Sequence, residues 1–256
     1  MCGLTTGPSR EEPARNLPEI VRRLSAAEDL DGPTRAGLLG RLAAMLAGSA
    51  RLAGVRAVTT GRWLADVVLE VAPQVPVRSA AVLRQQHPAL ADDDIAELLV
   101  AAASKATAAV GAAGGALAAV EFAVPPTLLT APVQLAAETV AVVAVELKLV
   151  AELHEIYGQA AAGTATDRTM RYAAAWAARR GVDPLSDEGI GGVLGGAARR
   201  QLRQRLVRRA GRNATTFAPF FAGALAGAEL NRRDTRNLGQ KMIEDLRQRR
   251  TGWYRP

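Results

Sequence analysis

Two long apolar segments, residues 95–124 and 132–157, constrain the fold of this chain more than any other feature, and Pro125-Pro126 separates them. A helix rises about 1.5 Å per residue, so each segment is long enough to cross the roughly 30 Å hydrocarbon core of a bilayer. The proline pair cannot continue a helix and predicts a turn between them. The pattern therefore predicts a helical hairpin, either in a membrane or at the centre of a helical bundle.

The charges within the hairpin favour a bundle core over a membrane. The two segments contain Lys105, Glu121, Glu138, Glu146, Lys148 and Glu152. A Lys or Asp at the centre of a bilayer costs about 2.5–3.5 kcal/mol on insertion scales. The second segment is also apolar almost all the way round, which is typical of a buried central helix. Buried carboxylates need partners, and we expect arginines of the C-terminal region to pair with Glu138 and Glu152.

Composition favours helices throughout. Hydrophobic residues make up 49% of the chain but aromatic residues only 4%, so Ala, Leu and Val must build the core, and Ala and Leu are strong helix formers. No segment alternates polar and β-branched residues as an exposed strand would. The predicted fold is all-α, a multi-helix bundle around the central apolar hairpin, with no sheet.

Proline, glycine and capping signals predict the helix boundaries and the domain organisation. Helices are expected at 18–27, 33–71, 77–86, 95–124, 132–157, 167–180, 187–212, 217–230 and 235–250. The helix at 33–71 is expected to be interrupted by its glycines: Gly37, Gly40, Gly48, Gly54 and Gly61. The predicted organisation is a flexible N-terminal tail (1–17), an N-terminal helical segment (18–90), a helical domain (91–250) and a C-terminal tail (251–256). The single cysteine, Cys2, excludes an internal disulfide, which fits a reducing compartment such as the cytoplasm.

Positive charge is concentrated near the C-terminus. The net charge of the chain is +7, but residues 199–256 carry +11 and residues 1–198 carry −4. Seven arginines line one expected basic helix: Arg199, Arg200, Arg203, Arg205, Arg208, Arg209 and Arg212. Such a helix can contact anionic lipid, bind nucleic acid, or pair with acidic groups of the same protein. Nucleic acid is the least favoured partner, because no aromatic residues interleave for base stacking.

Small residues recur every four positions after residue 219. Gly223, Gly227 and Asn231 lie on one side of an expected helix, where missing side chains allow another helix to approach closely. This spacing predicts helix packing, and Asn231 is also a candidate cap for the helix that follows.

Motifs for catalysis or metal binding are weak. Cys2 would suit an N-terminal nucleophile, but such enzymes need sheets. The glycine-rich segment 189–196 lacks a preceding strand and a Gly-Lys-Ser/Thr ending, so it does not match a phosphate loop. His87 and His154, the only histidines, have no further ligand at metal-binding spacing. No metal and no cofactor are expected, and a hydrolase using Glu138 and Glu146 is the remaining enzymatic hypothesis.

Residues 91–250 resemble the EcsC family of bacterial proteins. The shared order is an Ala/Gly-rich helix at 101–123, a proline-marked turn, a long apolar helix ending in Glu155-Ile156-Tyr157-Gly158, and a Pro219…Gly223-x3-Gly227-x3-Asn231 segment followed by a basic helix at 235–250. Two departures are Arg232, where an aromatic residue is usual, and the arginine run at 199–212. The resemblance implies a membrane-proximal role and supplies no catalytic residues.

The leading functional hypothesis is a non-enzymatic, EcsC-like helical protein with a basic C-terminal face. Its expected partner is an anionic membrane surface or a membrane protein, and its expected location is the cytoplasm, peripheral at the inner face of the cell membrane. The alternative is a soluble helical module that binds nucleic acid or another polyanion.

Overall fold

The computed structural model describes residues 17–26, 30–60, 62–121, 130–179 and 221–250, and these ranges contain helices and connections but no strand. The prediction of an all-α multi-helix bundle is therefore confirmed for the described residues. The helices are α1 (Leu17–Ala26), α2 (Gly32–Thr60), α3 (Arg62–Val71), the 3-10 turn η1 (Ala72–Gln74), α4 (Ala80–Gln86), α5 (Asp92–Glu121), α6 (Thr130–Ile156), α7 (Ala165–Arg179) and α9 (Phe221–Arg250). Residues 1–16 of the predicted N-terminal tail, the predicted C-terminal tail and the predicted helix at 187–212 lie outside these ranges. Leu17, the last residue of the predicted tail, belongs to α1.

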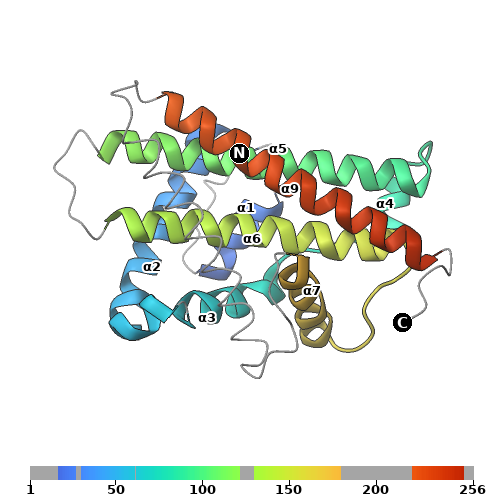
Figure 1. Ribbon diagram of the computed structural model, residues 1–256, viewed down its shortest axis with the longest axis horizontal. Coiled ribbons are helices and arrows are strands. Elements are labelled where there is room, and N and C mark those ends of the chain that lie inside the picture. Colours follow the sequence, from blue (N-terminus) through green and yellow to red (C-terminus); the bar gives the residue numbers. More distant parts are fainter. Residues whose placement is uncertain (1–16, 27–29, 61, 122–129, 180–220, 251–256) are drawn as a thin grey trace, which may run out of the picture.

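The central hairpin consists of α5 and α6, which lie side by side and run in opposite directions (Figure 1). Every residue of α6 from 134 to 153 is buried. α9 runs diagonally across the pair and makes its most extensive contact with α5 (Figure 1). Since protein covers α6 on all sides, this helix is the centre of the bundle, as its all-round apolar pattern predicts.

Two apolar clusters form the core, and α6 contributes to both. One combines the second half of α6 with α5, α7 and the C-terminal half of α9, and includes Leu149, Trp176 and Leu246. The other combines the first half of α6 with α1, α2 and α3, and includes Leu42 and Val140. Helices 17–71 therefore pack directly against the hairpin.

Local signals set several helix ends. The Asp31 carboxylate accepts the N–H of Thr34 at 2.7 Å at the start of α2, and the Ser79 hydroxyl accepts the N–H of Val82 at 3.4 Å at the start of α4. At the end of α6, Gly158 has φ +70°, a conformation that glycine adopts without strain.

One helix replaces the two that were predicted at 217–230 and 235–250. α9 runs unbroken from Phe221 to Arg250, so Asn231 does not cap a second helix, and that part of the prediction is wrong. The Asn231 side chain instead donates to the backbone oxygen of Thr107 on α5 at 3.0 Å. A bond to a neighbouring helix satisfies the amide and leaves the backbone of α9 helical.

The helix expected from 33 to 71 is divided. Gly54 adopts φ 82° and ψ 162° inside α2, and a separate helix, α3, begins at Arg62. Trp63 of α3 donates its indole N–H to the hydroxyl of Ser49 at 3.0 Å, which ties the two helices together after the chain has turned.

Among the described helices, one is long and apolar enough to cross a membrane by length and composition. It is Asp92–Gly115 within α5, and half of its most apolar window is buried inside the protein. Burial of this kind is also expected for a core helix of a bundle.

Candidate functional site

The basic C-terminal region is described in part. All seven arginines predicted to contact an anion or membrane, from Arg199 to Arg212, lie outside the described residues. The basic residues of α9 lie inside them, and they divide into a paired group at the end of the helix and an exposed group in its middle.

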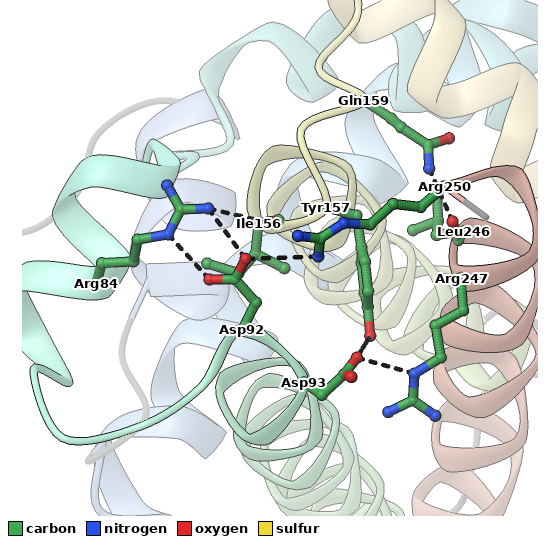
Figure 2. Close-up of polar contacts among 9 residues, drawn as sticks. All are labelled: Arg84, Asp92, Asp93, Ile156, Tyr157, Gln159, Leu246, Arg247 and Arg250. Atoms are coloured by element: carbon green, nitrogen blue, oxygen red, sulfur yellow. Dashed lines mark hydrogen bonds and ion pairs between the residues drawn. The ribbon is translucent and has the colours of Figure 1, made fainter. Parts of the chain in front are cut away.

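The last two turns of α9 are fastened to the first turn of α5 by ion pairs (Figure 2). Arg247 Nε lies 2.8 Å from Asp93 Oδ1, and Arg250 Nη1 lies 3.6 Å from Asp92 Oδ2. Arg84 of α4 also reaches Asp92, at 2.9 Å. The carboxylates favour the positive N-terminus of α5, and hydrogen bonds from Arg84 to Asp92 and from Tyr157 and Arg247 to Asp93 lower the pKa of each carboxyl.

The segment that follows α6 joins the same group, which we call the helix clasp: Arg84, Asp92, Asp93, Tyr157, Gln159, Arg247 and Arg250. The Tyr157 hydroxyl donates to Asp93 Oδ1 at 2.5 Å, and Gln159 Nε2 donates to the backbone oxygen of Leu246 at 2.8 Å. Burial and the bond to Asp93 raise the pKa of Tyr157 to about 12. The Glu155–Gly158 segment thus leads into a contact among the ends of α4, α5, α6 and α9.

The middle of α9 presents basic side chains to solvent. Arg232 and Arg233 both pair with Glu229 of the same helix, at 2.9 and 2.6 Å. Arg236 and Lys241 are exposed, and neither forms an ion pair within the described ranges. Arg236 and Lys241 therefore present exposed positive charge in the middle of α9.

The predicted packing residues lie at the crossing of α5 and α9. A Cβ atom on Gly111 would lie 2.7 Å from the backbone oxygen of Gly227, so the two backbones nearly touch. Asn231 follows one turn later and is 8% exposed. Gly223 lies in the first turn of α9, and its surroundings are outside the described residues.

The carboxylates of α6 are enclosed and bonded. Glu146 is fully buried and accepts the indole N–H of Trp176 at 2.8 Å and the hydroxyl of Thr235 at 2.9 Å. Glu138 lies against Gly114, where an added Cβ would overlap the Glu138 carboxylate. An acid held by internal donors in a closed core lacks access to a substrate, so the geometry does not favour the hydrolase hypothesis.

Glu152 has different partners from those expected. Lys148 Nζ lies 2.7 Å and Arg78 Nε 2.8 Å from Glu152 Oε1, so the expected pairing with C-terminal arginines is wrong for this residue. Arg78 comes from the connection before α4, which the tertiary fold brings beside α6. Burial raises the pKa of Glu152, but the hydrogen bonds and charges of Arg78 and Lys148 outweigh it and hold the pKa below 4.5.

The histidines and acids of the described residues form no cluster that could hold a metal ion. His154 Nδ1 lies 2.7 Å from the backbone oxygen of Val150, and its ring packs against Tyr172 with centroids 5.3 Å apart. Burial lowers the pKa of His154, so the ring is neutral at pH 7. Cys2 and the glycine-rich segment lie outside the described ranges.

Sequence reasoning missed the partners that lie far away along the chain. Trp176 and Thr235 bond to Glu146 across 30 and 89 residues, and Arg78 reaches Glu152 across 74. The one available signal was the presence of acids on an otherwise apolar helix, since such acids require buried donors.

Comparison with known proteins returns no match to a family model, to a curated protein or to a solved structure.

Proposed function

We propose that this chain is a non-enzymatic, EcsC-like helical protein that binds peripherally to anionic lipid at the cytoplasmic face of the membrane. The observation that carries the proposal is the net charge of +11 in residues 199–256, together with the exposed Arg236 and Lys241 of α9. Each basic residue near an anionic bilayer contributes about 1 kcal/mol of attraction.

The enclosed hairpin supports a peripheral rather than a spanning mode. Trp176 and Thr235 bond to Glu146, and Arg78 pairs with Glu152, at 2.8–2.9 Å from outside α6. Exposing α6 to lipid would separate the two acids from these partners. Leaving a buried charge without its partner costs about 3–5 kcal/mol. Contact through surface charge leaves the core intact.

The test is co-flotation with phosphatidylcholine vesicles prepared with and without phosphatidylglycerol, over a range of salt concentrations. We expect binding only to the anionic vesicles, weakening as salt rises, because added ions screen surface charge. Absence of binding to anionic vesicles would overturn the proposal, and so would binding that salt does not weaken.

Paired variants locate the contact. The double variant Arg236→Gln/Lys241→Gln removes two exposed charges from α9. For each charge removed, we expect about fivefold weaker binding to anionic vesicles. Arg41→Gln with Arg51→Gln is the matched control, since both arginines are exposed on α2 and form no ion pair in the described part of the chain. If both double variants lost vesicle binding equally, the result would contradict a specific contact through α9.

A gel shift with duplex DNA and with single-stranded RNA tests the alternative function. A salt-sensitive shift without vesicle binding would favour a soluble polyanion-binding module and overturn the membrane proposal. At a salt concentration where the protein still binds anionic vesicles, we expect no gel shift of DNA or RNA.

A further inference from the structure

A cavity of about 160 Å³ lies between α7, α6 and the chain segment at residues 72–77. Its apolar walls include Val75 and Val77 from that segment and Leu147 and Ala151 from α6. Arg236 and Lys241, the described basic residues of the proposed membrane contact, do not line it, and binding to the cavity can be measured without lipid.

The size and walls of the cavity suit a small apolar body. The cavity opens to solvent on one side, where Val77 is 37% exposed. Its volume is similar to that of an enclosed apolar cavity of roughly 150 Å³ that binds benzene in an unrelated, engineered protein. Binding sites for small molecules share this design, in which apolar walls hold the body and a few polar groups fix the orientation. The cavity therefore has room for a group about the size of one aromatic ring.

The polar side of the cavity comes from Arg168, Thr169 and Tyr172 on α7. Arg168 uses one of its five N–H donors, with Nη2 lying 2.9 Å from Glu155 Oε1, and its side chain is 40% exposed. The Tyr172 hydroxyl accepts the backbone N–H of Ala161 at 3.1 Å, which leaves its own proton to donate. A guanidinium and a phenol beside an apolar cavity favour a ligand that accepts hydrogen bonds and carries negative charge.

We propose that this cavity binds a small monocarboxylate with an apolar body, whose carboxylate pairs with Arg168. The planar guanidinium matches a carboxylate in a two-bond geometry, and the remaining N–H donors are available for it while one holds Glu155. The apolar body lies against Val75, Leu147 and Ala151.

Titration calorimetry with benzoate tests the proposal, with benzyl alcohol as the neutral analogue. We expect saturable one-to-one binding of benzoate and at least about tenfold weaker binding of benzyl alcohol, because a charge-assisted bond is lost. No saturation up to about 10 mM benzoate would overturn the proposal. Equal affinity for both compounds would overturn the assignment of a carboxylate ligand.

Variants then identify the site. Arg168→Gln is expected to weaken benzoate binding about tenfold, whereas Arg171→Gln, on the same helix but outside the cavity lining, is expected to leave it unchanged. Val77→Phe adds bulk at a position that is 37% exposed and is expected to block the cavity without disturbing the core. Binding that survives both Arg168→Gln and Val77→Phe would place benzoate elsewhere and overturn the proposal.

Glu155→Gln separates a binding role of Arg168 from a structural one. The Glu155 carboxylate repels a ligand carboxylate bound at the same guanidinium, so removing its charge is expected to tighten benzoate binding several-fold. If the Arg168–Glu155 pair only supports the structure, Arg168→Gln and Glu155→Gln should weaken benzoate binding equally. That result would overturn the assignment of Arg168. Melting temperatures of the variants identify any that fail to fold.

Discussion

The carboxylate of Glu146 accepts the indole N–H of Trp176 at 2.8 Å inside a core that excludes solvent. Its second oxygen accepts the hydroxyl of Thr235 at 2.9 Å, and Thr107 in turn donates to Thr235 at 2.9 Å. This chain of bonds joins α5, α6, α7 and α9 at one level of the bundle. Since a donor without its acceptor is costly in a core, the network fixes how these four helices stand relative to one another.

Trp176→Phe is expected to lower the free energy of unfolding by about 2–3 kcal/mol, because it removes a donor to a buried carboxylate. Trp63→Phe is the matched control, since its indole bonds to a neutral hydroxyl, that of Ser49, at 3.0 Å. A hydrogen bond between neutral groups contributes about 1 kcal/mol, so the control should lose less free energy of unfolding. Urea unfolding measures both, and an equal loss would contradict the importance assigned to the carboxylate.

Gly111→Ala is expected to destabilise the bundle by about 1–3 kcal/mol, because the new methyl group would lie 2.7 Å from the backbone of Gly227 and push α9 from α5. Gly37→Ala in α2 is the control, since a methyl group there would meet no neighbouring atom within 4 Å. At that position alanine should stabilise the helix by about 0.5–1 kcal/mol. Thermal unfolding that shifts both variants in the same direction would contradict the close approach of the two helices.

Glu152→Gln is expected to destabilise the protein at pH 7 by about 3 kcal/mol, because Arg78 and Lys148 lose their buried counter-charge. The folded pKa of Glu152 lies below its ordinary value of 4.5, so the ionised carboxyl stabilises the fold fully above pH 4.5. That stabilisation is lost as pH falls through the folded pKa.

The difference between wild type and Glu152→Gln should therefore shrink below pH 4.5. Urea unfolding at a series of pH values measures it. Glu70→Gln, at an exposed carboxylate on α3, is expected to stay within about 0.5 kcal/mol of wild type at pH 7. A difference between wild type and Glu152→Gln that is independent of pH would contradict the ion-pair origin of the effect.

Tyr157→Phe is expected to remove the tyrosine that ionises near pH 12 from an ultraviolet absorbance titration, because burial and Asp93 raise its pKa to about 12. A raised pKa favours the protonated phenol in the folded protein, so its stabilising contribution is present below pH 10. It declines as pH rises from 10 towards 12. Tyr172→Phe should leave the transition near pH 12 in place. If Tyr172→Phe removed this transition and Tyr157→Phe did not, the assignment to Tyr157 would be contradicted.

The helices that the sequence predicted best are those whose signals are local. The all-round apolar pattern of residues 132–157 and the glycine after Tyr157 act within a few residues of the structure they specify. The buried position of α6 follows from the same pattern, because a helix without a polar face has nowhere stable to lie except inside. The break predicted between residues 230 and 235 failed because Asn231 found its hydrogen-bond partner on another helix.

The sequence by itself determined the helical class, the hairpin and the need for buried partners to its acids, since composition and periodicity carry that information. Only the tertiary structure decided which residues are those partners: Trp176 and Thr235 for Glu146, and Arg78 for Glu152. These residues lie 30 to 89 positions away along the chain, and no local pattern records which distant side chain folding will bring within 3 Å. The cavity beside α7 has the same origin, because its walls come from three separate segments that meet only when the bundle is assembled.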